Sequence, residues 1–342
     1  MKRVPSLPDE HELDLPGIEQ QYDGPLARRF EQPQSRMIDR VLAGVVTFVP
    51  VIAVMLAIYL HVIGWYQIGM VEIGMLLMMH AIAVCGVELG FHRLFAHKSY
   101  SAKRWLRICL AGMGSMGFQG PVIWWAAIHR KHHIHSDRPN DPHSMYIRPG
   151  GTTVYNEGFW QHMKGFWHSH VGWIWTPLSI RAPGWNRYVK DLYKDPDILH
   201  VHVNYIYWLA AGFVIPGVLS GLIYMSWQGV VLGILWGGFV RIFVMNHLTY
   251  WSINTLSHSV GSRPYRTADR STNSIPLLMA VPTLGQSYHN NHHAFPYSAR
   301  MAYEWYELDL GLGILNVLKA CGQVSDMRQP SKEKRDAKKT RP

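Results

Sequence analysis

The chain has 342 residues, 48% of them hydrophobic and 16% charged, and its formal net charge is +10 at pH 7. No DNA- or RNA-binding motif accompanies the positive charge, so nucleic acid is excluded as the expected partner. The three cysteines lie far apart and form no C-x-x-C motif, which excludes an obvious disulfide framework and suits a reducing compartment.

The chain divides into three parts by composition. Residues 1–40 form a polar, proline-rich N-terminal arm without the apolar core of a cleavable signal peptide. Residues 41–321 contain the long apolar runs and are expected to form a membrane domain. Residues 322–342 form a basic tail, which we expect to be solvated and disordered; attraction to anionic lipid headgroups is the alternative.

Four apolar runs are each long enough to cross roughly 30 Å of hydrocarbon as a helix. They lie near 41–63, 68–89, 201–224 and 229–251, and short linkers at 64–67 and 225–228 join the members of each pair. The sequence therefore predicts an all-α integral membrane protein with four transmembrane helices in two hairpins. The alternative is a soluble protein with a buried helical core.

The distribution of Lys and Arg sets the expected orientation. Neither hairpin linker carries either residue, while the N-terminal arm, the segment 90–200 and the tail are rich in both. The positive-inside rule therefore places both termini and the segment 90–200 in the cytoplasm.

The segment 108–128 is also as long as a span and has no formal charge. Basic residues flank it on both sides, and four glycines and Pro121 interrupt it. We therefore expect an interfacial or re-entrant segment rather than a fifth crossing. The chemistry-bearing residues on either side of it then share one face of the membrane.

Three short histidine clusters have spacings that suit metal binding. In two of them the first histidine and the final pair occupy positions i, i+3 and i+4, so a helix puts the three imidazoles on one face. Neutral imidazole binds iron, zinc, copper and nickel, and eight such ligands exceed the four of a tetrahedral zinc. We predict a two-metal enzyme whose cytoplasmic helical cap holds the di-metal site. The clusters are His92 and His97; His129, His132 and His133; and His289, His292 and His293.

A fourth element follows the last apolar run, in the stretch Asn254-Thr-Leu-Ser-His258. The two polar residues are four apart, hence on one helical face, at the cytoplasmic end of that helix. His258 is a ninth candidate ligand, and Asn254 is a candidate to hold a metal-bound water.

Further polar residues could orient the ligands from outside. Glu88 lies four residues before His92 and could fix its tautomer. His247 lies eleven residues before His258, near the same helical face, and packing is an equally open role for it. The candidates for such outer positions are Glu88, Asp137, Asp141, His143, His170 and His247.

These clusters resemble the histidine boxes of the membrane fatty acid desaturases, in particular the bacterial and cyanobacterial delta-9 type, which is related to animal stearoyl-CoA desaturase. The resemblance covers residues from about 40 to 321, with the motifs in the family's order. The matching stretches are Gly90-Phe-His-Arg-Leu-Phe-Ala-His97, His129-Arg-Lys-His-His133, Asp141-Pro-His143, Ser169-His-Val-Gly-Trp173, Asn254-Thr-Leu-Ser-His258 and His289-Asn-Asn-His-His-Ala-Phe-Pro296.

The resemblance implies two iron ions and an oxygen-dependent removal of two vicinal hydrogens from an acyl chain, leaving a cis double bond. It implies no catalytic residue beyond the ligands, a separate electron donor (ferredoxin, rubredoxin or cytochrome b5 with its reductase), and a multi-pass protein of a bacterial inner membrane. Asn254 matches the family position that holds a water. The implied iron ligands are His92, His97, His129, His132, His133, His258, His289, His292 and His293.

The sequence departs from the animal acyl-CoA members at Ala127-Ile128, where those carry an Arg-Asp pair. This departure argues against recognition of CoA and leaves phospholipid and acyl-carrier-protein substrates open. Met70, Met75, Met78 and Met79 of the second run either line the acyl tunnel or pack between helices.

Three alternative functions remain at this point. A hydroxylase or an acetylenase would keep the same di-iron site and change the product. A metal transporter would carry its polar ligands at mid-membrane depth, whereas these clusters lie at the cytoplasmic edge. We therefore expect an acyl desaturase first.

Overall fold

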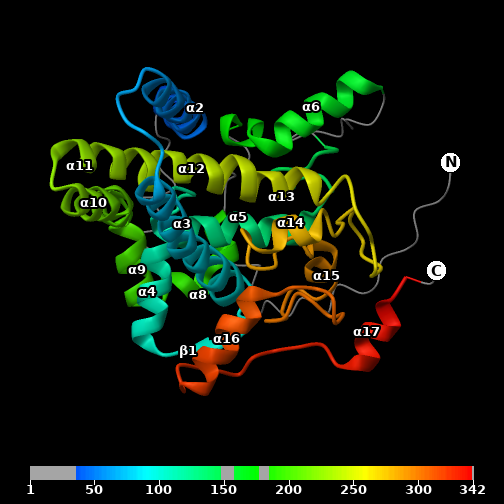
Figure 1. Ribbon diagram of the computed structural model, residues 1–342. Coiled ribbons are helices and arrows are strands. Elements are labelled where there is room, and N and C mark those ends of the chain that lie inside the picture. The colour runs from blue at the N-terminus through cyan, green and yellow to red at the C-terminus, as the bar shows by residue number, and fades with distance from the viewer. Residues whose placement is uncertain (1–35, 148–157, 177–184, 341–342) are drawn as a thin grey trace.

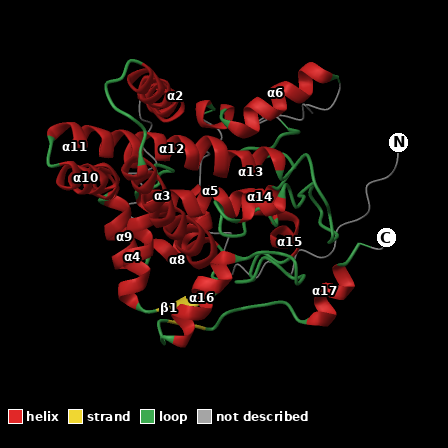
Figure 2. Ribbon diagram, in the orientation of Figure 1, coloured by secondary structure: helices red, strands yellow, loops and turns green. Residues whose placement is uncertain are grey.

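The computed structural model describes residues 36–147, 158–176 and 185–340, so most of the N-terminal arm lies outside the described residues. Figure 1 shows long helices packed beside a cap of shorter ones, and Figure 2 shows that strands are a very small part of the fold. The expected all-α membrane fold is confirmed.

The membrane part consists of α2 (Arg36–Val62), α3 (Met70–Cys85), η2 (Gly86–Ala96), α10 (Tyr205–Tyr224), α11 (Trp227–Gly233), η5 (Ile234–Val240), α12 (Arg241–Phe243), η6 (Val244–Tyr250) and α13 (Trp251–Leu256). The cap consists of β1 (Ser101–Ala102), α4 (Arg104–Ser115), α5 (Val122–His135), α6 (Phe159–His170), η3 (Gly172–Trp175), η4 (Trp185–Val189), α8 (Lys190–Tyr193), α9 (Pro196–Val203), α14 (Pro276–Ala280), α15 (His289–Ala294), α16 (Leu310–Ala320), β2 (Val324–Ser325) and α17 (Lys332–Lys338).

Among the described residues, four continuous helices are long and apolar enough to span a membrane, as predicted: Met37–Val62, Met70–Ala96, Tyr205–Tyr224 and Trp227–Leu256. The second and fourth extend beyond their predicted ends at 89 and 251, because they continue into the histidine-bearing segments. Only 28% of the most apolar window of the first span is buried, against 56% in the last. The first span therefore lies at the periphery, and the last forms the centre of the bundle.

The α10–α11 hairpin packs closely because glycine lines the contact. A Cβ atom at Gly233 would lie 2.1 Å from the carbonyl oxygen of Pro216, so only glycine permits this approach. Small residues bring membrane helices into close contact in this way.

Three stretches, η2, η5 and η6, are π-helical, with i to i+5 hydrogen bonds. At the end of η2 the amide of His97 donates to the carbonyl of His92 at 3.0 Å. This wider turn brings residues five apart toward one face, which an α-helix would not do.

The segment 108–128 does not form one helix. Helix α4 ends at Ser115 and α5 starts at Val122, and the connector between them holds Gly117, Gly120 and Pro121. Within the last span, the buried Arg241 donates through Nη1 to the carbonyl of Met116 at 2.7 Å. The interruption predicted from the glycines and proline is confirmed.

The C-terminal tail differs from its prediction, because residues 322–340 are folded onto the cap. Strand β2 pairs with β1, and the amide of Arg266 donates to the carbonyl of Lys338 at 2.8 Å. Lys338 in turn donates from Nζ to the carbonyl of Ala294 at 3.0 Å. These contacts hold a segment whose composition alone favours disorder.

Candidate metal centre

Nine histidines converge from four parts of the chain: η2 with the turn after it, α5, the end of the last span, and α15. They form two groups, each with one ring nitrogen per residue lying within 4.8 Å of the others. We call them group one (His92, His97, His129, His133 and His292) and group two (His132, His258, His289 and His293). All nine candidate ligands from the sequence are therefore brought together.

Group one has its Nε2 atoms directed at one another. Nε2 of His97 lies 2.8 Å from that of His129, which lies 3.1 Å from that of His133. Nε2 of His292 lies 2.9 Å from that of His133 and 3.1 Å from that of His92. Nitrogens bound at right angles about 2.1 Å from one metal ion are roughly 3 Å apart, so this spacing fits ligation of a single ion.

Group two has the same character. Nε2 of His258 lies 3.1 Å from that of His289, and the ring centroids of His289 and His293 are 4.3 Å apart. Among the described residues, the buried Nε2 atoms of His132 and His293 have no hydrogen-bond partner. Buried polar atoms rarely stay unpaired, so a bound cation would supply what these nitrogens lack.

Helices α5 and α15 each contribute to both groups. On α5, His129 and His133 belong to group one and His132 to group two. On α15 the assignment is reversed, since His289 and His293 belong to group two and His292 to group one. The i, i+4 pair therefore binds on one side and the i+3 residue on the other, which places the two groups next to each other.

Carboxylates hold four of the imidazoles by Nδ1, which leaves Nε2 free for a metal. In group two all three carboxylates are aspartates that come from loops, whereas in group one a single glutamate lies on η2 itself. The pairs are Glu88 with His92 (3.1 Å), Asp141 with His132 (2.9 Å), Asp137 with His258 (2.9 Å) and Asp269 with His293 (2.6 Å).

Burial first and neighbouring imidazoles second lower the pKa of most of these histidines well below 6.5, which keeps the rings neutral. The residues are His97, His129, His132, His133, His289 and His292. Burial also lowers the pKa of His258, but the carboxylates of Asp137, Asp269 and Asp141 together outweigh it and raise the pKa to about 9. A metal ion binding at His258 must therefore displace a proton.

Two buried arginines hold the backbone around group one. Arg93, next to His92, bonds Glu88 and Asp309 and donates to two backbone carbonyls. Arg130, next to His129, donates to the carbonyls of residues 95 and 96 and forms two bonds with Asp191. Arg130 thereby fixes the end of η2 against α5.

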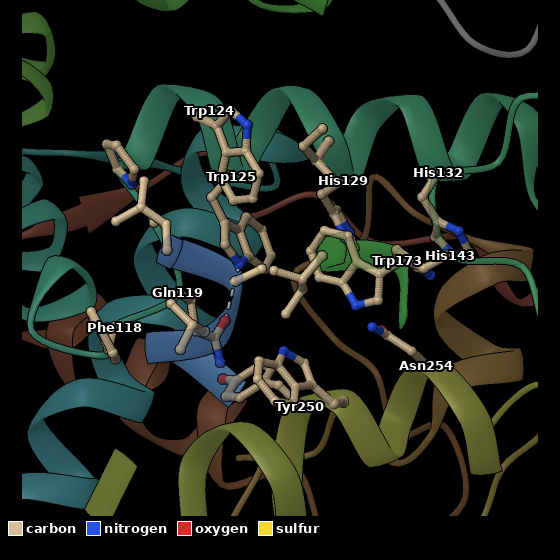
Figure 3. Close-up of a pocket in the computed structure, with 18 of the residues that line it drawn as sticks. Phe118, Gln119, Trp124, Trp125, His129, His132, His143, Trp173, Tyr250 and Asn254 are labelled. Atoms are coloured by element: carbon tan, nitrogen blue, oxygen red, sulfur yellow. Dashed lines mark hydrogen bonds between the residues drawn. The ribbon is translucent and has the colours of Figure 1, made fainter. Parts of the chain in front are cut away.

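A cavity of about 780 Å³ reaches both groups. Figure 3 shows Trp124, Trp125 and His129 projecting from α5 toward Tyr250 on the last span. The indole of Trp125 donates to Oε1 of Gln119 at 3.0 Å and stacks on His129 with ring centroids 4.9 Å apart. The cavity is thus lined by aromatic and aliphatic side chains and ends at imidazoles.

The four methionines of the second span do not line this cavity. Met79 is fully buried and packs against the last span at Gly237, and Met70 is 85% exposed. Packing, rather than tunnel lining, is therefore what Met79 does, because its side chain points between the helices.

Asn254 and His143 lie beside the site. Asn254 projects from the last span into the cavity, and its backbone carbonyl accepts from Ser169 Oγ at 2.8 Å (Figure 3). His143 stacks on His132 with ring centroids 4.2 Å apart. His143 therefore packs a ligand candidate, as expected of an outer residue.

His170 and His247 lie elsewhere, so their expected role beside the ligands is corrected. Their rings face each other at 5.8 Å, and Nε2 of His247 lies 3.1 Å from the carbonyl of Thr47 on α2. An eleven-residue spacing keeps two residues on one face of an α-helix, but the π-helical η6 adds a wider turn between His247 and His258. His247 consequently faces α2.

Two site residues escaped the sequence reasoning. Asp269 lies in a loop and has no spacing that links it to His293. Gln286 is buried, lines the cavity and has Nε2 3.3 Å from Nε2 of His92. Its position three residues before His289 is the one signal that could have indicated it.

Comparison with known proteins places this chain among proteins that act on fatty acyl chains. The fatty acid desaturase family model matches residues 70–311. A hex-5-enoyl-[acyl-carrier protein] acetylenase of Moorena producens is 40% identical, covering 85% of this chain and 87% of that protein. An sn-1 stearoyl-lipid 9-desaturase of Anabaena variabilis is 36% identical over 72% of this chain and 80% of that protein. A probable acyl-CoA desaturase of Schizosaccharomyces pombe is 32% identical, covering 67% of this chain and 43% of that protein.

The family match, the four apolar helices and the two histidine groups agree with one another. The chain belongs to the fatty acid desaturase family.

Proposed function

We propose that this protein is a di-iron acyl desaturase that uses O2 to introduce a cis double bond into an acyl chain. The observation that carries the proposal is the convergence of two all-histidine groups at the end of one aromatic cavity. The nine imidazoles of these two groups suit first-row metals that must leave positions open for another molecule. Bound irons would supply the oxidising power that an unactivated methylene requires.

The residues of the chain would bind and orient the metal ligands and the acyl chain, and they would exclude water from the site. The aspartates and Glu88 orient the imidazoles through Nδ1, and Asn254 would hold a water at one ion. Trp125 and Tyr250 form apolar walls that keep an acyl chain in place near His129. Since no side chain acts as an acid or base on the methylene, positioning is the main contribution of the protein.

The acyl carrier is inferred from the named relatives and from the side chains that line the cavity. The named relatives act on an acyl-carrier-protein thioester, a lipid and, by name, acyl-CoA. Within the part of the chain that the structure describes, no Lys or Arg lines the cavity, and Ala127 and Ile128 precede the second cluster. We therefore propose a lipid- or carrier-protein-bound chain in preference to CoA. A delta-9 position remains our first expectation, with the site on the cytoplasmic face of a bacterial inner membrane.

A second candidate is an acetylenase, which removes two hydrogens from an existing double bond. It is favoured by the 40% identity to the Moorena protein over 85% of this chain. The same two histidine groups would serve, because the site need only remove another pair of hydrogens from a chain held in the same cavity.

The test is expression in a host that lacks its own desaturase, followed by mass spectrometry of the acyl chains. We expect a loss of two mass units with a cis double bond, and a triple bond at the same position if the acetylenase proposal holds. A gain of sixteen mass units would indicate a hydroxylase. The proposal fails if an iron-loaded, reduced preparation leaves both lipid-bound and carrier-bound chains unchanged.

A further inference from the structure

The loop 263–270 covers group two and is bonded to it in two places. Oδ2 of Asp269 lies 2.6 Å from Nδ1 of His293. The backbone amide of Arg270 donates to Oδ2 of Asp137 at 2.8 Å, and the same oxygen lies 2.9 Å from Nδ1 of His258. His293 is therefore linked to this loop by one hydrogen bond, and His258 is linked to it by two in series, through Asp137.

The outer side of the same loop is strongly basic. Arg263, Arg266 and Arg270 are exposed, while the one carboxylate of the loop, Asp269, faces inward to His293. Three exposed guanidinium groups thus belong to the loop that is hydrogen-bonded to His293 through Asp269 and to Asp137 through the amide of Arg270.

The C-terminal helix α17 extends this basic surface. The amide of Thr340 donates to the carbonyl of Pro264 at 2.8 Å, and Arg266 donates to the carbonyl of Ala337 at 2.5 Å. Residues 332–339 carry five basic and two acidic side chains. We call loop 263–270 together with residues 332–339 the basic platform.

Group one is linked to surface charge in a different place, because Asp191, which binds Arg130, also pairs with the exposed Lys98. Its carboxylate, Glu88, and that carboxylate's partner, Arg93, are both fully buried. Of the two groups, group two is the one that hydrogen bonds link to the basic platform.

We propose that the basic platform is the docking surface for the electron donor, and that the donor is a small acidic one-electron carrier protein. This inference rests on the proposed function. Desaturation by the overall reaction R–CH2–CH2–R′ + O2 + 2e⁻ + 2H⁺ → R–CH=CH–R′ + 2H2O takes two electrons from the acyl chain and two from the donor. Two successive encounters with a one-electron carrier supply the two electrons that come from the donor.

Charge and connectivity both support this position. A basic surface raises the rate at which an acidic partner associates, and the effect weakens as salt rises. A carrier held over loop 263–270 would lie against the segment that bonds His258 and His293 through Asp137 and Asp269. Electrons would therefore enter at group two.

The test uses the full-length, iron-loaded protein with two donors, an acidic [2Fe–2S] ferredoxin and the soluble domain of a cytochrome b5. The variants are Lys332→Glu and Lys334→Glu, singly and together; both residues are exposed and lie on α17. The matched control is Lys319→Glu, which makes the same charge change at an exposed site on α16, away from the platform.

We expect the double variant to lower kcat/KM for the donor about tenfold or more at low salt and to flatten its salt dependence. Single turnover after reduction by dithionite should equal that of the unaltered protein, because a small reductant needs no docking surface. Lys319→Glu should match the unaltered protein in both assays.

An unchanged kcat/KM with both donors would overturn the proposal, as would an equal loss with Lys319→Glu. An equal loss in the dithionite assay would also overturn it, since the substitutions would then act on the metal site itself. Absence of product from the dithionite-reduced unaltered protein would instead refute the proposed function.

Discussion

Groups one and two are built from the same side chain but are held in different ways. In group one, a single imidazole of five is held by a carboxylate, and two buried arginines, Arg93 and Arg130, bind the backbone around it. In group two, three imidazoles of four are held at Nδ1 by Asp137, Asp141 and Asp269.

The difference follows from where the ligands lie. Group one takes His92 and His97 from a membrane helix and the turn after it, where the backbone is already rigid and orients the rings. Group two takes His258 from the turn after the last span and its other three ligands from the cap helices α5 and α15, while its three aspartates lie in loops that long-range contacts position. Its rings therefore need carboxylates to fix their tautomer and direction. We expect the two groups to respond differently to substitution around the ligands and alike to loss of a ligand.

The largest effect should come from removing one ligand candidate in each group. His97→Ala and His293→Ala should each reduce product below detection, because chemistry needs both ions. Iron bound per chain, measured by elemental analysis, should fall from about two to about one in each variant. Retention of turnover in either variant, or loss of both ions from each, would remove the distinction between the groups.

The next effect tests the anchoring of group one by arginine. Arg130→Met leaves three backbone carbonyls without their donor and leaves Lys98 as the remaining partner of the Asp191 carboxylate, so the free energy of unfolding should fall by about 3 kcal/mol. Denaturant unfolding in detergent measures it. Arg104→Met breaks an exposed pair with Asp197 and should leave the unfolding midpoint unchanged. Equal stability of both variants would show that Arg130 anchors nothing.

A smaller effect should follow from altering one carboxylate of group two. Asp269→Asn keeps the shape of the side chain and removes the charge that holds His293, so iron affinity at group two should fall about 10- to 100-fold. Iron titration followed by spectroscopy measures this. Group one should keep its affinity, and the exposed Asp326→Asn serves as control. A matching loss at group one would contradict the separation of the two groups.

The smallest effect concerns Gln286, which contacts group one from the cavity. Gln286→Leu removes the amide 3.3 Å from Nε2 of His92 without a change in charge. Loss of one such contact should lower turnover about fivefold at unchanged iron content. Steady-state rates with a saturating donor measure it, and an unchanged rate would mean that the amide only fills space.

The parts of the site that depend on local periodicity could be predicted from the sequence. Spans of 20 or more apolar residues and histidines at i, i+3 and i+4 both reflect helix geometry, so the spans and the nine candidate ligands could be read directly. Asp269 could not be found this way, since a loop carboxylate has no periodic relation to a histidine on another helix. Spacing left the role of His247 open between packing and an outer position beside the ligands, because π-helical turns leave no signal that a spacing argument uses.

Hydrophobicity and charge thus determined that this chain spans a membrane and that its histidines cluster, because both properties depend on neighbours along the chain. Folding in three dimensions decided which histidine joins which group, which carboxylate holds it, and that the basic tail folds over loop 263–270. Those contacts join residues far apart in sequence, and the free energy that selects them comes from burial and pairing that exist only once the helices have packed.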